Sequence, residues 1–246
     1  MTSQRFQWPN GKRAAVSLTF DDGRESQLDC AIPLLDAWGV QASFYISPAG
    51  VRSRIEDWKR AMASGHEIGN HTVSHPCSGN FPFSRCNALE DYTLERIEQE
   101  IVEANAFIET AFGSRPQTFA YPCGERFVGR GEGTQSYVPI VAKHFLVGRG
   151  FGEWGINDPA CCDLAKARSQ EMDGVSFENL KPAVAQAVQY GGWLILTGHD
   201  AGPSGAQTTR TDALEALCRH MAEPGQGLWV DTVRAIGSYI QQARSR

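Results

Sequence analysis

The sequence predicts an α/β protein whose parallel strands close into a TIM-barrel-like barrel. Apolar segments of strand length alternate along the chain with longer segments of helical periodicity, which is the pattern of parallel strands wrapped by helices. Polar clusters also follow one expected strand after another at its carboxyl end, where the loops of such barrels converge and carry catalytic groups. The alternation alone fits an open, doubly wound sheet equally well, so the polar clusters decide for the barrel.

The expected strands are short apolar runs bounded by turn-forming residues, and the expected helices are the amphipathic segments between them. Strands are predicted over residues 14–20, 42–46, 67–70, 118–121, 145–148, 193–197 and 227–230. Helices are predicted over residues 28–38, 55–64, 89–112, 177–190, 211–221 and 232–244. Residues 76–87 and 124–137 are rich in Gly, Pro, Ser and Asn, and we expect both to form loops over the barrel mouth.

The composition fits one soluble globular domain that covers residues 1–246, with 41% hydrophobic and 21% charged residues. The net charge is −5 and the basic residues are scattered, which argues against nucleic acid or a membrane as a partner. Residues 1–11 lack the basic start and apolar run of a secretory signal, so the cytoplasm is the default location. In that setting the seven cysteines, an odd number, are read as mostly reduced thiols.

Two adjacent carboxylates end the first expected strand. In the sequence TFDDG, Asp21 and Asp22 repel each other unless a cation or a proton lies between them, which favours a metal site. An aspartate at a strand-to-helix turn is also a common helix N-cap, so the pair alone leaves both interpretations open.

Two histidines four residues apart form a second cluster, in the sequence NHTVSH. On one helical turn His71 and His75 would lie on the same face, a geometry that proteins use for zinc and related metals. An aspartate and two histidines leave open positions for water and substrate, as a catalytic metal requires. The expected cofactor is a divalent metal, zinc in the first place, with cobalt and nickel as alternatives.

A third cluster, His199 followed by Asp200, ends the apolar run WLILTG. A histidine there can reach the same cleft and protonate a leaving group, because its pKa lies close to neutral pH. A structural histidine is the alternative interpretation. His66, His144 and His220 lack a comparable setting, and we assign them no catalytic role.

The motifs and their order resemble the polysaccharide deacetylases, carbohydrate esterase family 4, which share a homology domain with chitooligosaccharide deacetylases. T-F-D-D-G is complete at residues 19–23 and H-[ST]-x-x-H at residues 71–75. The resemblance covers most of the chain and implies a distorted (β/α)7 barrel of parallel strands. Carried over by position, it makes Asp21 the general base, Asp22, His71 and His75 the metal ligands, and His199 the general acid.

The third family motif departs from its commonest form, R-x-P-Y, because the sequence A-Y-P-C ending at Cys123 occupies its place. Some family members share the F-A-Y-P form. The arginine that steadies the base is missing, and we expect Arg149 to supply a replacement charge near Asp21, with a surface arginine as the alternative. The backbone N–H of Cys123 occupies the position that the family uses as an oxyanion donor, a role that survives a change of side chain.

The sequence leaves open the roles of several further residues near the motifs. Asp158 and Asp173 are candidates for the aspartate that the family places against the acid histidine, and neither has a context that assigns it this role. Cys77, Cys86 and Cys123 fall beside the second and third motifs. Thiolates bind zinc, but no C-x-x-C spacing occurs, so we expect small apolar packing roles.

The predicted function is metal-dependent removal of N- or O-acetyl groups from a carbohydrate. One alternative is hydrolysis of a small cyclic amide, since allantoinase-like and cyclic-imidase-like relatives share the scaffold but commonly lose metal ligands. The other alternative is a carbohydrate-binding protein with an inactive site, which the missing motif arginine would explain. The aromatic residues in or near the expected mouth loops either stack on sugar rings or pack the loops; they are Phe81, Phe83, Tyr137 and Trp154.

Overall fold

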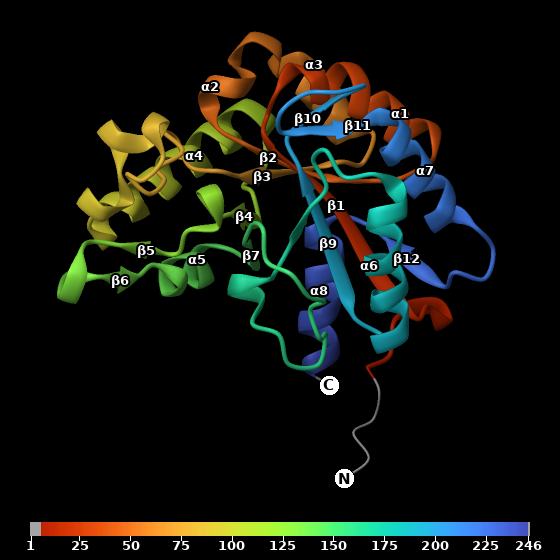
Figure 1. The fold of residues 1–246 in the computed structure, drawn as a ribbon. Coiled ribbons are helices and arrows are strands. Elements are labelled where there is room, and N and C mark those ends of the chain that lie inside the picture. The colour runs from red at the N-terminus through yellow and green to blue at the C-terminus, as the bar shows by residue number, and fades with distance from the viewer. Residues whose placement is uncertain (1–5, 246) are drawn as a thin grey trace.

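The computed structural model describes residues 6–245, whose central feature is a curled sheet of parallel strands with helices on its outside (Figure 1). The sheet is centred on β1 (Ala14–Asp22), which pairs with β2 (Ser43–Ile46) and with β9 (Trp193–Gly198). The first residues of β1 also pair with β12 (Leu228–Val230). All three pairings are parallel, as the alternation of strands and helices predicts.

The strand order is β7-β4-β3-β2-β1-β9-β8, with β12 outside this path. The remaining strands are β3 (Glu67–Asn70), β4 (Thr118–Ala120), β7 (Val147–Arg149) and β8 (Gln170–Glu171). The two edges of the sheet are connected. Arg149 of β7 forms a bridge with Ala167, just before β8, through hydrogen bonds of 2.8 Å from Gly150 N to Ala167 O and from Ala167 N to Gly148 O. The prediction of a distorted barrel of parallel strands is confirmed.

The six expected helices lie close to their predicted positions, with two differences at their starts, and two short helices over residues 48–51 and 138–144 were not expected. The helix expected from residue 28 begins with a π-helical turn over Gln27–Ala31 before α1 (Ile32–Ala37). The helix expected from residue 89 begins only at Leu94, because the Thr93 hydroxyl accepts the Arg96 N–H and caps the helix there. Within residues 6–245 the α-helices are α1, α2 (Pro48–Val51), α3 (Ile55–Ala63), α4 (Leu94–Phe112), α5 (Val138–His144), α6 (Phe177–Tyr190), α7 (Thr211–Ala222) and α8 (Val233–Arg244).

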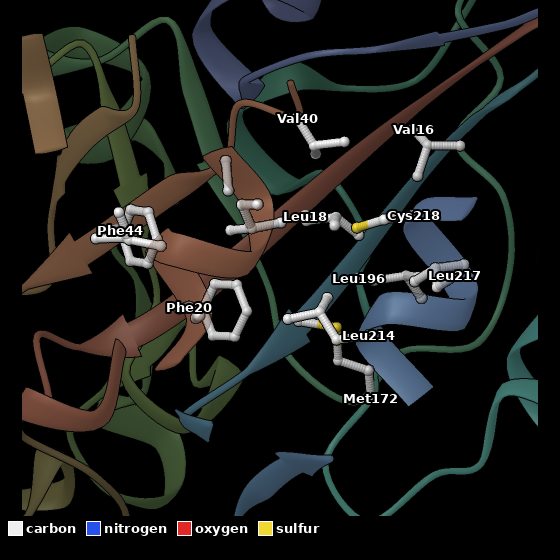
Figure 2. Close-up of a cluster of buried hydrophobic side chains, with 14 of the residues drawn as sticks. Val16, Leu18, Phe20, Val40, Phe44, Met172, Leu196, Leu214, Leu217 and Cys218 are labelled. Atoms are coloured by element: carbon white, nitrogen blue, oxygen red, sulfur yellow. The ribbon is translucent and has the colours of Figure 1, made fainter. Parts of the chain in front are cut away.

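Side chains of β1 alternate between the outer core and the barrel interior, as the two-residue period of a strand requires. Val16, Leu18 and Phe20 belong to the large core cluster, which also includes side chains of α7 and β9 (Figure 2). The intervening residues are polar and buried, and Thr19 hydrogen-bonds across the interior to Thr197 at 2.9 Å. This alternation carries Asp21 into the interior at the carboxyl end of β1.

The segment expected as a loop over residues 124–137 contains a short antiparallel hairpin of β5 (Phe127–Val128) and β6 (Gln135–Ser136). A second short pair, β10 (Asp200–Gly202) and β11 (Thr208–Arg210), follows β9. Both pairs are too short to show a strand pattern in the sequence.

No export signal is expected in residues 1–11, and residues 1–5 of this segment lie outside the described part. Within residues 6–245, no helix combines the length and the apolar character needed to cross a membrane.

The cysteine prediction is wrong for one pair. Cys77 and Cys123 form a disulfide with a Cα–Cα distance of 6.0 Å, whereas both were expected to be thiols that pack as small apolar side chains. The physical reason is topological: β3 and β4 are neighbours in the sheet, so the loops that follow them meet. The other cysteines are free.

Candidate active site

Three potential metal ligands converge at the carboxyl ends of β1 and β3. The Asp22, His71 and His75 ligand atoms all lie within 4.8 Å of one another. Asp22 Oδ1 is 3.6 Å from His71 Nε2 and 3.7 Å from His75 Nε2. The three side chains that the sequence selected are therefore brought to one point.

The environment of His71 fits a metal ligand. Its Nδ1 donates a hydrogen bond of 2.9 Å to the carbonyl of Ala120, which orients the ring and leaves Nε2 as the acceptor atom. Nε2 is buried and has no hydrogen-bond partner among residues 6–245. Because buried polar atoms are rarely left unpaired, an unpaired nitrogen facing a carboxylate and a second imidazole fits a divalent cation.

The loop that carries the two histidines is not helical, in contrast to the expected helical turn. Thr72 has φ 64° and His75 has φ 51°, both in the left-handed region, and the imidazole centroids are 4.8 Å apart. Glu100 of α4 holds this loop by accepting the N–H groups of Val73 at 3.0 Å and Ser74 at 2.9 Å. The ligand geometry therefore depends on a carboxylate from a distant helix as well as on the histidine spacing.

Charge and burial keep Asp22 and His75 in their metal-binding forms at neutral pH. Burial and the neighbouring His71 lower the pKa of His75 to about 4, although Asp22 acts in the opposite direction, so the imidazole is neutral. Burial raises the pKa of Asp22, but the nearby histidines and Arg24 outweigh burial and lower this pKa to about 2.

Asp21 lies beside this set and is paired with a buried arginine. Its Oδ1 accepts a hydrogen bond from Arg149 Nη2, and its Oδ2 is 3.9 Å from His71 Nε2. The Arg149 side chain is fully buried, donates through Nη1 to Gly150 O at 2.9 Å and stacks over the Tyr45 ring. Arg149 is thus an interior residue that touches the predicted base, and the alternative of a surface arginine is wrong.

His199 lines a pocket together with Asp21, Asp22 and His75, and its imidazole has a carboxylate partner. Its Nδ1 donates a hydrogen bond of 2.6 Å to Asp173 Oδ2, while Asp173 Oδ1 accepts from the His199 N–H and from Thr209. Burial lowers the pKa of His199, but the Asp173 hydrogen bond and the nearby Asp21 outweigh burial and raise it. Asp173, not Asp158, is the partner that the sequence left open; Asp158 instead caps a turn by accepting the Ala160 N–H.

The signal that could have identified Asp173 was weak. Asp173 stands two residues after β8, where the polar-cluster rule places functional side chains, but β8 is too short to be recognised in the sequence. Arg24, which contacts Asp22, was also missed, because an arginine just after an acidic pair carries no chemical pattern of its own.

The site residues Asp21, Asp22, Arg24, His75 and His199 line a pocket of about 420 Å³. Phe81 and Phe83 form a stacked pair at its wall, with centroids 5.5 Å apart and exposed fractions of 41% and 68%. Cys86 is exposed and has no place in the pocket lining. The lining is Asp21, Asp22, Arg24, His75, Phe81, Phe83, Cys123, Phe151, His199 and Gln207.

Two of the aromatic side chains considered for sugar stacking are not part of this wall. Tyr137 is buried and packs against Tyr121, so it fills the protein interior instead. Trp154 is exposed but does not line the pocket. The remaining histidines have carboxylate neighbours outside the pocket: Asp36 for His66, Glu98 for His144 and Glu223 for His220.

Solved structures of low sequence identity share this fold. A Mycobacterium smegmatis protein assigned as a polysaccharide deacetylase is 16% identical with a TM-score of 0.69, and the match covers 98% of this chain and 95% of that one. A family 4 acetyl xylan esterase from Clostridium thermocellum, in complex with a cobalt ion, is 22% identical with a TM-score of 0.58, covering 92% and 91%.

Sequence comparison gives the family. A gellan lyase from Bacillus sp. is 26% identical over 227 residues, but the chain spans only 7% of the lyase, and it spans 27% of the YlxY protein of Bacillus subtilis. The profile described as polysaccharide deacetylase matches residues 9–129. A chitooligosaccharide deacetylase from Bradyrhizobium sp. (strain ANU 289) is 30% identical over 202 residues, which are 81% of this chain and 76% of that protein. With its motifs in place on the shared barrel, the chain belongs to the polysaccharide deacetylase family.

Proposed function

We propose that this protein hydrolyses acetyl groups of a carbohydrate in a reaction that depends on a divalent cation. The observation that carries the proposal is the convergence of the Asp22, His71 and His75 ligand atoms within 4.8 Å, beside a separate carboxylate and a histidine. Family membership supports carbohydrate deacetylation in general. The acetylated carbohydrate and its N- or O-linkage are the finer part of the proposal.

The cation would be held by Asp22, His71 and His75, a donor set suited to zinc, cobalt or nickel. When bound, such a cation supplies Lewis acidity, which polarises a carbonyl group and lowers the pKa of a water molecule. The cobalt ion of the related acetyl xylan esterase structure is compatible with this assignment.

Asp21 is the proposed general base. Its carboxylate is buried in the barrel, is held by Arg149, and would accept a proton from the attacking water. The water oxygen forms a bond to the acetyl carbon as that proton moves to Asp21. Arg149 thereby takes the role of the arginine missing from the third motif.

The negative charge that develops on the acetyl oxygen needs a hydrogen-bond donor. Cys123 lines the pocket with φ 53°, and the hydrogen bonds of its turn use the N–H groups of Gly124 and Glu125 instead. We assign the Cys123 N–H to this oxyanion, where one such donor contributes about 3–4 kcal/mol to transition-state stabilisation.

His199 is the proposed general acid. The bond from the acetyl carbon to nitrogen or oxygen breaks as His199 donates a proton to the leaving amine or alcohol, and acetate is released. Asp173 holds the imidazole through Nδ1, which directs the other ring nitrogen, Nε2, to the leaving group. The phenyl ring of Phe151 packs edge-on against His199, with centroids 5.4 Å apart, and limits its movement.

The experiment is a metal analysis combined with acetate release from acetylated chitooligosaccharides and acetylxylan. The unchanged protein should bind a divalent metal ion and release acetate from its substrate. Removing the metal ion with a chelator should abolish acetate release. Asp21→Asn and His199→Ala should retain the metal and lose turnover. Asp158→Asn, which alters only a distant turn, is the matched control and should keep full activity.

Two outcomes would overturn this proposal. Metal binding without any acetate release would favour a carbohydrate-binding protein with an inactive site. Absence of metal binding would favour the cyclic-amide or inactive alternatives. Neither alternative is favoured by the present observations, because the ligand set is complete and the related proteins include named deacetylases.

A further inference from the structure

Arg24 lies at the site but has no role in the proposed reaction, although its side chain contacts Asp22, Asp200 and Gln207. It follows Gly23 at the carboxyl end of β1 and lines the pocket. Its guanidinium donates to Asp22 Oδ2 twice, from Nε at 3.0 Å and from Nη2 at 2.8 Å. Nη1 donates to Asp200 Oδ2 at 2.5 Å, and Nη2 also reaches Gln207 Oε1 at 3.0 Å.

The two oxygens of Asp22 are divided between two neighbourhoods. Oδ1 lies 3.6 Å from His71 Nε2 and 3.7 Å from His75 Nε2, so it faces the candidate metal position. Oδ2 carries both hydrogen bonds from Arg24 and points to the opposite side. Arg24 therefore fixes which carboxylate oxygen is presented beside the histidines.

Arg24 is itself anchored from a separate segment of the chain. Asp200, which it contacts, accepts a second hydrogen bond at 2.6 Å from Ser26. Because Asp200 balances the guanidinium charge, the positive charge of Arg24 adds little repulsion to a cation bound beside Asp22. Its rigid planar fork donates to both carboxylates in a fixed geometry, which the compact ammonium group of a lysine does not reproduce.

Asp200 is also the direct neighbour of His199 in the sequence. Arg24 thus connects Asp22, a proposed metal ligand, to the carboxyl end of β9, where Asp200 follows the proposed acid His199. The guanidinium is about a quarter exposed. Desolvation offsets much of the attraction in such a partly buried ion pair, so the bridge is weak evidence for a role in stability.

We propose that Arg24 is a positioning residue that orients Asp22 so that only Oδ1 is available as a metal ligand, with Asp200 as its anchor. The inference rests on the proposed function, since it presumes a cation at Asp22, His71 and His75. Hydrogen bonds to ligating groups commonly determine metal affinity, and their removal typically weakens it about 10- to 100-fold.

The test is calorimetric titration of the metal-free protein with Co²⁺. Arg24→Ala should weaken Co²⁺ binding by about 10- to 100-fold. Arg24→Lys should bind with intermediate affinity, because it retains the charge without the fork. Arg54→Ala is the matched control, since Arg54 also bridges two carboxylates, Asp29 and Asp57, but lies outside this pocket, and it should leave the affinity unchanged.

A spectroscopic readout separates orientation from folding. In Arg24→Ala the visible absorption bands of bound Co²⁺ should change, because a freed Oδ2 alters the ligand arrangement, while the far-ultraviolet circular dichroism stays the same. If Arg24→Ala does not fold, Arg24→Lys and Asp200→Asn provide the same two measurements. Asp200→Asn should also weaken binding, because it removes the anchor.

The outcomes are distinguishable from those of the proposed function. If the unchanged protein binds no Co²⁺, both the proposed function and this inference are overturned. If the unchanged protein binds Co²⁺ and folded Arg24 variants bind it equally well with the same spectrum, this inference alone is overturned. An equal loss of affinity in Arg54→Ala would also overturn it, because the effect would not be specific to Arg24.

Discussion

Arg149 Nη2 donates a hydrogen bond to Asp21 across 128 residues of sequence, and both side chains are buried in the barrel. The contact joins the carboxyl ends of β7 and β1, which are not neighbours in the sheet. Closing the sheet into a barrel is therefore what allows the two charges to meet. This contact is the basis for our proposal that Arg149 replaces the arginine missing from the third motif.

Arg149→Met should destabilise the fold and reduce turnover. Removing one partner of a buried ion pair leaves an uncompensated charge and typically costs about 3–5 kcal/mol. Urea unfolding monitored by circular dichroism measures the free energy of unfolding of each variant. The double variant Asp21→Asn with Arg149→Met should regain part of this stability, since it leaves no unpaired charge. Equal stability of Arg149→Met and the unchanged protein would contradict the buried pairing.

Asp173→Asn should shift the pH dependence of turnover. Burial lowers the pKa of His199, but Asp173 and the nearby acids raise it overall. Because a general acid must be protonated, activity is lost as the pH rises through this pKa. The asparagine removes a negative charge, lowers the pKa and should move the alkaline limb of kcat to lower pH. A pH–rate profile of both proteins checks this, and an unmoved limb would contradict the role of Asp173.

The parts of the site that the sequence predicted are those with a local pattern. Asp21 and Asp22 are adjacent, His71 and His75 are four residues apart, and His199 ends an apolar strand. Each pattern can be recognised without knowing which strands are neighbours. The same holds for the fold, because alternating strands and helices predict parallel pairing, and polar residues at the strand ends predict the barrel.

The parts that were missed depend on contacts between distant segments. The Cys77–Cys123 disulfide requires the loops after β3 and β4 to meet, and the separation of 46 residues does not reveal that. Asp173 and Arg24 likewise acquire their roles only from what the barrel places opposite them. The histidine loop departs from a helical turn for the same reason, because Glu100 from α4 holds its backbone.

Replacing both disulfide cysteines, Cys77→Ser with Cys123→Ser, should lower the free energy of unfolding by about 2–4 kcal/mol, because the bond restricts the unfolded chain. Urea unfolding measures the change, and a reducing agent should have the same effect on the unchanged protein. Cys86→Ser is the matched control, since Cys86 is exposed and free. Unaltered stability in the double variant would show that the two sulfurs are not bonded.

Phe83→Ala should weaken substrate binding with little effect on stability or on the chemical step. Its ring is 68% exposed, stacks on Phe81 and lines the pocket, so it offers an apolar face to a sugar ring without supporting the core. We expect KM to rise several-fold while kcat and the unfolding midpoint stay close to their original values. Phe127→Ala, at a similarly exposed aromatic residue on the β5–β6 hairpin, should leave KM unchanged. Steady-state kinetics on an acetylated oligosaccharide would refute the assignment if the two variants behaved alike.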